Sequence, residues 1–233
     1  MERMPYNEQI KALTKISKAI TSDLYLDDIL RLIVAVTAEV MGSNICSLWL
    51  VDEKDKTLKL RASQTISREY LKERSLKVGE GIVGQVAREK KPIVILDVMK
   101  EPKYKEKTLA KKEKLRSMLS VPLIVRDKVI GVINCYTSKI HKFSENEINI
   151  LTAVANQAAV AIENTGLMVK TKVIHEELMS RKKIERAKGI LMKGDGLTEE
   201  EAYLRLQRYS MDNRKTMREV AEAIILAVDI GKK

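Results

Sequence analysis

Apolar residues in the first part of the chain alternate between helical and strand spacing. Two helices are expected, one marked by Ile10, Leu13, Ile16 and Ile20 and one by Ile29, Ile33, Val36 and Val40, with a break over residues 23–28. Short runs rich in branched apolar residues then predict strands over residues 44–51, 57–63, 91–97, 120–126 and 129–136, the last two joined as a hairpin. This part of the chain is therefore an α+β module with about five or six strands.

From Ser144 onward the pattern becomes helical. Ser144 and Glu147 have the spacing of a capping box, in which the serine oxygen accepts the amide of the third helical residue and the glutamate reaches back. Apolar positions recur at helical spacing through residues 148–192, and no proline follows Pro122. One helix of about 49 residues is expected, which Gly166 could interrupt. A helix of that length cannot bury its apolar stripe on one small domain, so a paired coiled coil is expected.

Two shorter helices are predicted after the long one. Each begins with a Thr-x-x-Glu capping box, at residues 198 and 216. They cover residues 199–211 and 217–230, and the second carries an apolar stripe on one face. Together with the end of the long helix they form a minimal three-helix bundle.

Composition excludes several classes of protein. The 233 residues carry 43 Lys and Arg against 32 Asp and Glu, a formal charge of +11 that favours a polyanionic partner. Two cysteines cannot build a disulfide framework. The N-terminus has no signal-peptide pattern, and the longest uncharged run, residues 148–162, is too short for a membrane span. We therefore expect a cytoplasmic protein with no membrane partner.

Several segments of the first part resemble the GAF domain. They are Gly-Glu-Gly-Ile-Val-Gly at residues 79–84, the run 91–98, Val-Pro-Leu-Ile at 121–124, Val-Ile-Gly-Val-Ile at 129–133 and Phe-Ser at 143–144. The resemblance implies a small-molecule-sensing and dimerising module built on an antiparallel sheet, over residues 1–165. A ligand pocket is expected to include Leu48, Ile82, Asp97, Ser120 and Asn134, and the identity of its ligand is open.

The C-terminal part is similar to the ANTAR domain. The resemblance rests on Ile-Glu-Arg-Ala-Lys-Gly-Ile-Leu-Met at residues 184–192, Glu-Ala-Tyr-Leu-Arg-Leu at 201–206, Ser-Met-Asp-Asn-Arg at 210–214 and Glu-Val-Ala at 219–221. It implies a three-helix RNA-binding module of transcription antitermination regulators, which bind paired stem-loops in nascent messenger RNA and prevent terminator formation. We expect this domain over residues 181–233, joined to the first by a coiled-coil helix over residues 166–180.

A basic segment supports contact with RNA. Residues 181–193 hold six basic residues and one acid, and cations displace counterions from phosphates. The expected RNA-binding residues are Lys182, Lys183, Arg186, Lys188, Gly189, Lys193, Tyr203, Arg205 and Arg214. The alternatives are a solvated helix face and, for Tyr203, packing in the core. A second basic segment, residues 100–116, is interpreted as a solvated lid over the ligand pocket.

Few residues point to catalysis. Cys46 and Cys135 fall in predicted strands, where buried, inert thiols are the usual case. His141 and His175 are too few and too far apart for a recognisable metal site. We therefore expect no catalytic residues, no metal and no cofactor beyond a small-molecule ligand.

These patterns together predict a homodimeric RNA-binding antitermination regulator that binds tandem hairpins, with no duplex DNA as partner. Two rivals stay open. One is a GAF-type methionine sulfoxide reductase or redox sensor using Cys46 and Cys135, and the other is a DNA-binding regulator with residues 199–230 as a helix-turn-helix. A further hypothesis is that a ligand in the first domain alters the pairing of the long helix.

Overall fold

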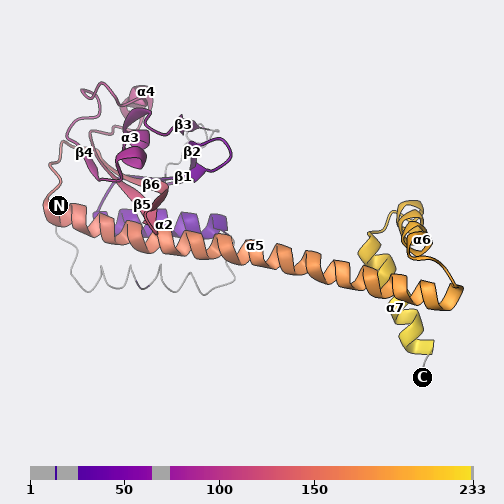
Figure 1. The fold of residues 1–233 in the computed structure, drawn as a ribbon. Helices are drawn as coiled ribbons and strands as arrows, with labels where there is room; N and C mark the ends of the chain where they lie inside the picture. The colour runs from indigo at the N-terminus through magenta and orange to yellow at the C-terminus, as the bar shows by residue number, and fades with distance from the viewer. Residues whose placement is uncertain (1–13, 15–25, 65–73, 232–233) are drawn as a thin grey trace. The chain divides into compact units, whose positions relative to one another are not determined.

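The computed structural model describes residue 14, residues 26–64 and residues 74–231. The chain divides into two compact units, residues 1–166 and 167–233, which Figure 1 traces. The first predicted helix lies outside the described residues except at residue 14, which is helical. Among the helices of the described part, none has the length and apolar character needed to cross a membrane.

A six-stranded antiparallel sheet is the centre of the first unit. Its spatial order is β3-β2-β1-β6-β5-β4, and its strands are β1 (Ile45–Asp52), β2 (Thr57–Ser63), β3 (Ser75–Lys77), β4 (Ile93–Ile95), β5 (Ser117–Val125) and β6 (Lys128–Thr137). β5 and β6 form the predicted hairpin, and its two turn residues, Arg126 and Asp127, have φ of 47° and 66° as a two-residue hairpin turn requires. The three-residue β3 was not predicted, because so short a strand shows no alternation.

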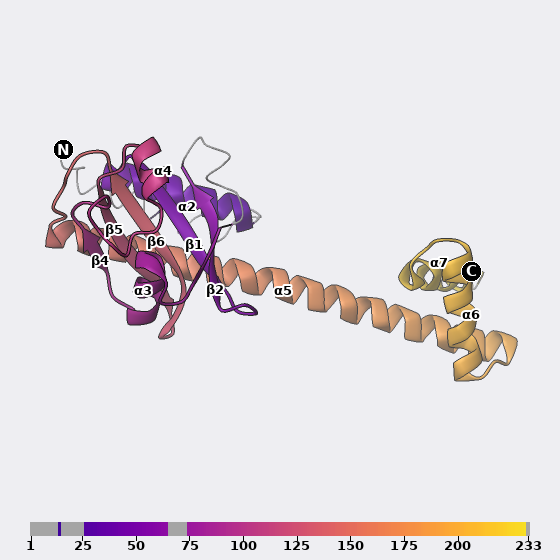
Figure 2. The same cartoon turned by 90° about the horizontal axis from the view of Figure 1, so that it is seen from above.

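Two helices cover one face of the sheet. α2 (Leu26–Met41) and the first part of α5 (Glu145–Asp195) lie side by side against it (Figures 1 and 2). Alternate strand residues such as Cys46, Leu119 and Ile133 point to this face and pack with Leu30 and Leu151. α2 includes residues 26–28, so the predicted break does not extend over them, and residues 23–25 lie outside the described residues.

The opposite face of the sheet is covered by α3 (Gly81–Glu89), α4 (Lys107–Lys112) and their loops (Figure 2). Trp49, Met118 and Tyr136 lie in this second core. Gly84 of α3 approaches the backbone closely, since a Cβ there would lie 2.4 Å from the carbonyl oxygen of Lys77. The glycine-rich segment therefore allows α3 to pack against the end of β3.

The long helix is confirmed as α5. It begins at the predicted capping box, in which the Ser144 N–H donates to Glu147 Oε2 at 2.8 Å and the Glu147 N–H donates to Ser144 Oγ at 3.3 Å. It ends at Asp195, three residues beyond the expected end, and Gly166 does not interrupt it. No proline follows Pro122 in the sequence, so no residue of α5 lacks the backbone N–H that the helix uses.

The second unit is a small helical bundle, as predicted. α6 (Glu199–Asp212) and α7 (Met217–Gly231) pack with the end of α5 around Ala187, Leu206, Val220 and Ala221. Both predicted capping boxes are present, with Thr198 and Glu201 at the start of α6 and Thr216 and Glu219 before α7. The cluster of four buried side chains is small, so the caps at its edge matter more to the stability than they would in a larger domain.

The capping glutamates predict a pH dependence of stability in this unit. Hydrogen bonds from Thr198 lower the pKa of Glu201 below its usual 4.5, and those from Thr216 lower the pKa of Glu219. A pKa that is lower in the folded chain than in the unfolded chain stabilises the fold above about pH 4.5, and that stabilisation is lost as the pH falls through the folded-state value. Thermal unfolding followed by circular dichroism should therefore show a falling midpoint below about pH 4.5.

The double variant Glu201→Gln and Glu219→Gln is the matched control, because glutamine keeps the capping hydrogen bond but does not titrate. Its unfolding midpoint should change less with acidification than that of the wild-type chain. Identical pH profiles for the two chains would contradict this origin of the effect.

Candidate nucleic-acid interface and sensor face

The predicted basic segment lies on the last turns of α5, and two of its cations are paired with acids of α7. Lys183 Nζ donates to Glu222 Oε1 at 2.5 Å. The guanidinium of Arg186 donates to both carboxylate oxygens of Asp229, at 2.9 and 3.0 Å. All four side chains are between 38% and 59% exposed, and exposed pairs are weak. These cations are therefore neutralised in this structure but remain able to exchange partners.

Lys188 has a different environment from the other lysines of the segment. Only 6% of the residue is exposed, and its Nζ donates to Glu199 Oε1 at 2.7 Å and to Glu185 Oε2 at 3.0 Å. The hydrogen bonds to Glu199 and Glu185 raise the pKa of Lys188, and the bond from Lys188 lowers that of Glu199. Glu199 is the first residue of α6, so Lys188 fastens α6 to α5 rather than presenting a free charge.

Three predicted RNA contacts remain unpaired. Lys182, Lys193 and Arg214 are exposed, and no carboxylate within residues 74–231 forms an ion pair with them. Arg214 has a left-handed φ of 52° in the turn between α6 and α7, which projects its side chain from the end of α6. Among the predicted RNA contacts, these three cations can meet a phosphate without breaking an ion pair.

The remaining predicted contacts are at the surface or partly open. Tyr203 is 43% exposed, whereas Ala202 and Leu206 occupy the core positions of α6. Arg205 forms an exposed ion pair with Asp195. A Cβ built on Gly189 would meet nothing within 4 Å, so nothing in the unit requires glycine there. Glycine inside a helix lowers helix stability by up to about 1 kcal/mol relative to alanine. A reason for glycine at this position is that it allows another molecule to approach the helix backbone closely.

A buried polar chain lies on the α3 face of the sheet. Ser120 Oγ donates to Asn134 Oδ1 at 2.7 Å, and Asn134 Nδ2 donates to Ser47 Oγ at 3.2 Å. All three residues are fully buried. The predicted pocket residues Ser120 and Asn134 are thus brought together, and Ser47 joins them although sequence reasoning missed it.

The same core contains an unsatisfied donor. The indole N–H of Trp49 is buried and has no hydrogen-bond partner in the described part of the chain. Trp49 follows Ser47 by two residues on β1, so both side chains are on the α3 face. Ile82 packs in this core as well. Sequence reasoning did not select Trp49, because a tryptophan in an apolar strand is most often a packing residue.

Asp97 lies at the edge of this core and has its own partners. Its carboxylate accepts from the Arg116 guanidinium at 3.1 Å and from the Met99 N–H at 3.0 Å. Only 9% of Asp97 is exposed. These bonds hold the loop after β4 against the residue that precedes β5.

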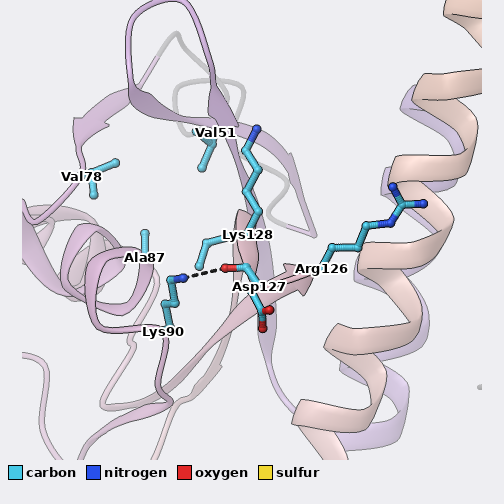
Figure 3. Close-up of a pocket in the computed structure, with 8 residues that line it drawn as sticks. Val51, Val78, Ala87, Lys90, Arg126, Asp127 and Lys128 are labelled. Carbon is cyan, nitrogen blue, oxygen red and sulfur yellow. Dashed lines mark hydrogen bonds between the residues drawn. The ribbon is translucent and has the colours of Figure 1, made fainter.

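A separate depression of about 350 Å³ lies between α3 and the β5–β6 turn. Figure 3 shows Val51, Val78 and Ala87 facing it, with Arg126 extending away toward the helices. Lys90 Nζ donates to the carbonyl oxygen of Asp127 at 2.6 Å and closes one side. None of the five predicted pocket residues lines this depression.

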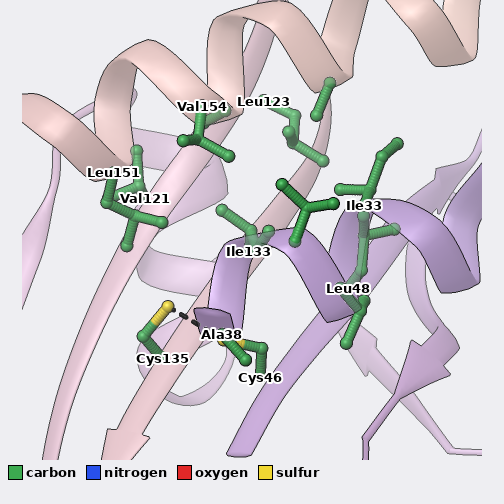
Figure 4. Packing of buried hydrophobic residues seen from close by; sticks show 14 of the residues in the cluster. Ile33, Ala38, Cys46, Leu48, Val121, Leu123, Ile133, Cys135, Leu151 and Val154 are labelled. Carbon is green, nitrogen blue, oxygen red and sulfur yellow. Dashed lines mark hydrogen bonds between the residues drawn. The ribbon is translucent and has the colours of Figure 1, made fainter. Parts of the chain in front are cut away.

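Leu48 is not brought to the other predicted pocket residues. It belongs to the core on the helix-covered face, beside Ile33 of α2 (Figure 4). Side chains of a strand alternate between the two faces, so Ser47 and Trp49 point to one side and Leu48 to the other. The strand was located correctly by its apolar residues, but these do not reveal which of its side chains points to which face of the sheet.

The two cysteines face each other across β1 and β6 on the helix-covered face (Figure 4). Their sulfurs are 3.1 Å apart, and both residues are fully buried. Burial raises the pKa of the Cys135 thiol, whereas reactive cysteines need a lowered pKa and access to solvent. Across residues 26–64 and 74–231, no three His, Cys, Asp or Glu side chains are grouped as a metal site would need.

Comparison with known families places two domains on the chain. The family description "GAF domain" matches residues 24–163, and "ANTAR domain" matches residues 173–225. The transcriptional regulatory protein PdtaR of Mycobacterium tuberculosis is 43% identical over 63 residues, which cover 27% of this chain and 31% of PdtaR. The combination is that of a regulatory protein.

Other relatives share the first domain. A phosphoenolpyruvate-dependent phosphotransferase system protein of Escherichia coli is 28% identical over 155 residues, covering 66% of this chain and 21% of that protein. The chain thus spans about a fifth of the length of that relative. The solved GAF domain of a Coxiella burnetii phosphotransferase superposes with a TM-score of 0.63 at 24% identity, covering 70% of this chain and 98% of that one.

A free methionine-R-sulfoxide reductase of Neisseria meningitidis also shares the fold. Its TM-score is 0.58 at 21% identity, covering 71% of this chain and 95% of that one. At that identity the likeness concerns the fold alone, so it does not bring the reductase activity to this chain.

The burial of Lys188 generates a stability prediction. Replacing it by alanine removes the bridge between α5 and α6 and leaves Glu185 and Glu199 close together without their cation, so the second unit should unfold at a lower temperature. Lys182→Ala is the matched control, since substitution of an exposed, unpaired lysine changes stability by less than about 0.5 kcal/mol. Equal thermal unfolding midpoints for the two variants would show that the Lys188 bridge does not stabilise the second unit.

Proposed function

The chain belongs to the GAF domain family, and on this premise we propose that it is an RNA-binding transcription antitermination regulator. Its GAF domain is the sensor, and the ANTAR domain that follows binds stem-loops in nascent messenger RNA and keeps a terminator hairpin from forming. The protein acts where transcripts emerge, in the cytoplasm. The match to the ANTAR family and the 43% identity to the transcriptional regulatory protein PdtaR support this proposal.

One observation carries the proposal most directly. Within the region that matches the ANTAR family, Lys182, Lys193 and Arg214 are exposed and unpaired, and Gly189 has open space beside it. Free cations bind phosphates by releasing counterions, and a glycine allows a backbone or base to come close. This arrangement suits a folded nucleic acid with a phosphate backbone and exposed loops.

The proposed active form is a homodimer. Leu167, Ile174 and Leu178 of α5 are between 48% and 64% exposed although they are large and apolar. Their spacing of seven and four residues is the spacing of a coiled-coil seam. A second copy of α5 would cover this stripe, and two RNA-binding modules in one dimer then hold two hairpins. Binding of the second hairpin benefits from the effective concentration set by the first.

The ligand of the sensor is proposed to bind at the α3 face of the sheet. The buried N–H of Trp49 lacks an acceptor there, and Ser47, Ser120 and Asn134 form a polar chain beside it. A buried donor without a partner is costly. A small molecule with a hydrogen-bond acceptor near the indole would satisfy it.

The two rival functions have less support. A sulfoxide reductase needs an accessible thiolate, whereas Cys46 and Cys135 are buried, and burial raises the pKa of Cys135. A helix-turn-helix places its second helix in the DNA major groove, but α7 carries two acids, Glu222 and Asp229, that pair with α5. Repulsion between such acids and phosphates disfavours that docking.

A gel-shift titration at several salt concentrations tests the proposed function. The probes are an RNA with two tandem hairpins, a single hairpin and a DNA duplex of matched length. Lys193→Ala should weaken binding to the tandem RNA and reduce the magnitude of the salt slope by about one, because one phosphate contact is lost. Lys172→Ala, an exposed lysine on the same helix outside the ANTAR match, should change neither quantity.

Equal salt slopes for the wild-type chain and Lys193→Ala would contradict the proposal that Lys193 contacts a phosphate. Tighter binding to the duplex than to either RNA would replace the proposed function with the DNA-binding alternative.

A further inference from the structure

A groove opens on the surface of the second unit between the end of α5, α6 and α7. Its volume is about 320 Å³. Leu191, Leu206 and Ile224 line it with apolar side chains, and Tyr209 and Arg205 of α6 contribute the polar groups. Tyr209 is 57% exposed. The groove therefore combines an apolar lining, one accessible aromatic ring and one guanidinium.

Two alanines of α7 keep the groove open. Ala223 and Ala227 both line it, and their spacing of four residues places them on the same face of the helix. The larger side chains Leu226 and Ile230 of the same helix are 60% and 65% exposed and do not line the groove. α7 thus borders the groove with two short side chains beside Val220 and Ile224, and a larger side chain at either alanine position would reduce its volume.

We propose that this groove receives one unstacked base of an RNA loop, with its ring against Tyr209 and its neighbouring phosphate at Arg205. The inference rests on the proposed function, and it deepens that function by naming where loop sequence is read. RNA-binding proteins recognise single-stranded loops by splaying bases out and stacking them on aromatic rings. The volume of the groove, about 320 Å³, is near the lower end of the range for ligand sites. It therefore fits one small planar group better than a larger ligand.

Charge around the groove fits this occupant. The ion pair that holds Arg205 to Asp195 is exposed on both sides, so a phosphate can replace the carboxylate at little cost. Arg205 itself lines the groove, so a base held there has this guanidinium within reach for a neighbouring phosphate.

The test begins with RNA selected on the wild-type chain from a pool of tandem hairpins with randomised loops. Each loop position of the selected RNA is then replaced by an abasic nucleotide, and affinities are measured by gel shift. At one position per loop, removal of the base should weaken binding at least about tenfold, because the stacking contact is lost.

Two variants then locate that base. Ala227→Leu fills the groove, and Tyr209→Ala removes the ring. In both, intact RNA should bind at least about tenfold more weakly, and the abasic substitution at the critical position should cost nothing further, because interacting groups show non-additive effects. Leu204→Ala is the control, since Leu204 is 51% exposed on the same helix and does not line the groove; it should keep the full abasic penalty.

The outcomes separate this inference from the function it rests on. Absence of any selected RNA would overturn both. RNA binding in which no loop position is critical, or in which the abasic penalty persists in Ala227→Leu and Tyr209→Ala, would overturn the groove assignment alone. A change of oligomeric state in Ala227→Leu would show that the groove holds a second copy of the chain instead. If Ala227→Leu does not fold, the abasic penalty measured with Tyr209→Ala decides between these outcomes, because Tyr209 is exposed and its substitution leaves the core intact.

Discussion

Ion pairing inside the C-terminal unit decides which of its cations can meet a phosphate. Lys183, Arg186 and Arg205 each face an exposed carboxylate, and Lys188 is buried between two. Of the six cations in residues 181–193, three are therefore held in ion pairs in the folded protein. Non-specific binding to polyanions grows with the number of phosphates neutralised. A module that pairs several of its cations internally keeps fewer of them for phosphates, which suits the proposed recognition of the shape and loops of an RNA as well as its charge.

The long helix α5 contributes residues to the cores of both units. α5 contributes Leu151 to the core beneath the sheet and Ala187 to the small core of the C-terminal bundle. Over residues 167–179, between the parts of α5 that pack in the two cores, its large apolar residues are exposed, as at Ile174, which is 64% exposed. A helix without proline can extend through a stretch that packs on neither core, but its apolar stripe then needs a partner, and a second copy of the chain has the matching stripe.

Periodic features of the sequence predicted the helices and most strands of the fold. They did not predict which pairs of side chains come into contact. The caps at Ser144, Thr198 and Thr216 follow from spacing within one helix turn, so all three were found. Which acid faces Lys188 depends on how α6 docks, and which face Leu48 joins depends on the helices that cover the sheet. The groove beside Tyr209 was not predicted, because helical phase alone does not show where α7 leaves a gap.

The stoichiometry of the RNA complex tests the central claim most directly. Analytical ultracentrifugation of the full chain with an RNA of two tandem hairpins should give a complex of two chains and one RNA, and Ile174→Asp, which places a charge in the exposed stripe, should reduce both self-association and affinity for the tandem RNA. A complex of one chain on one hairpin, bound as tightly as the tandem RNA and unaffected by Ile174→Asp, would contradict the account.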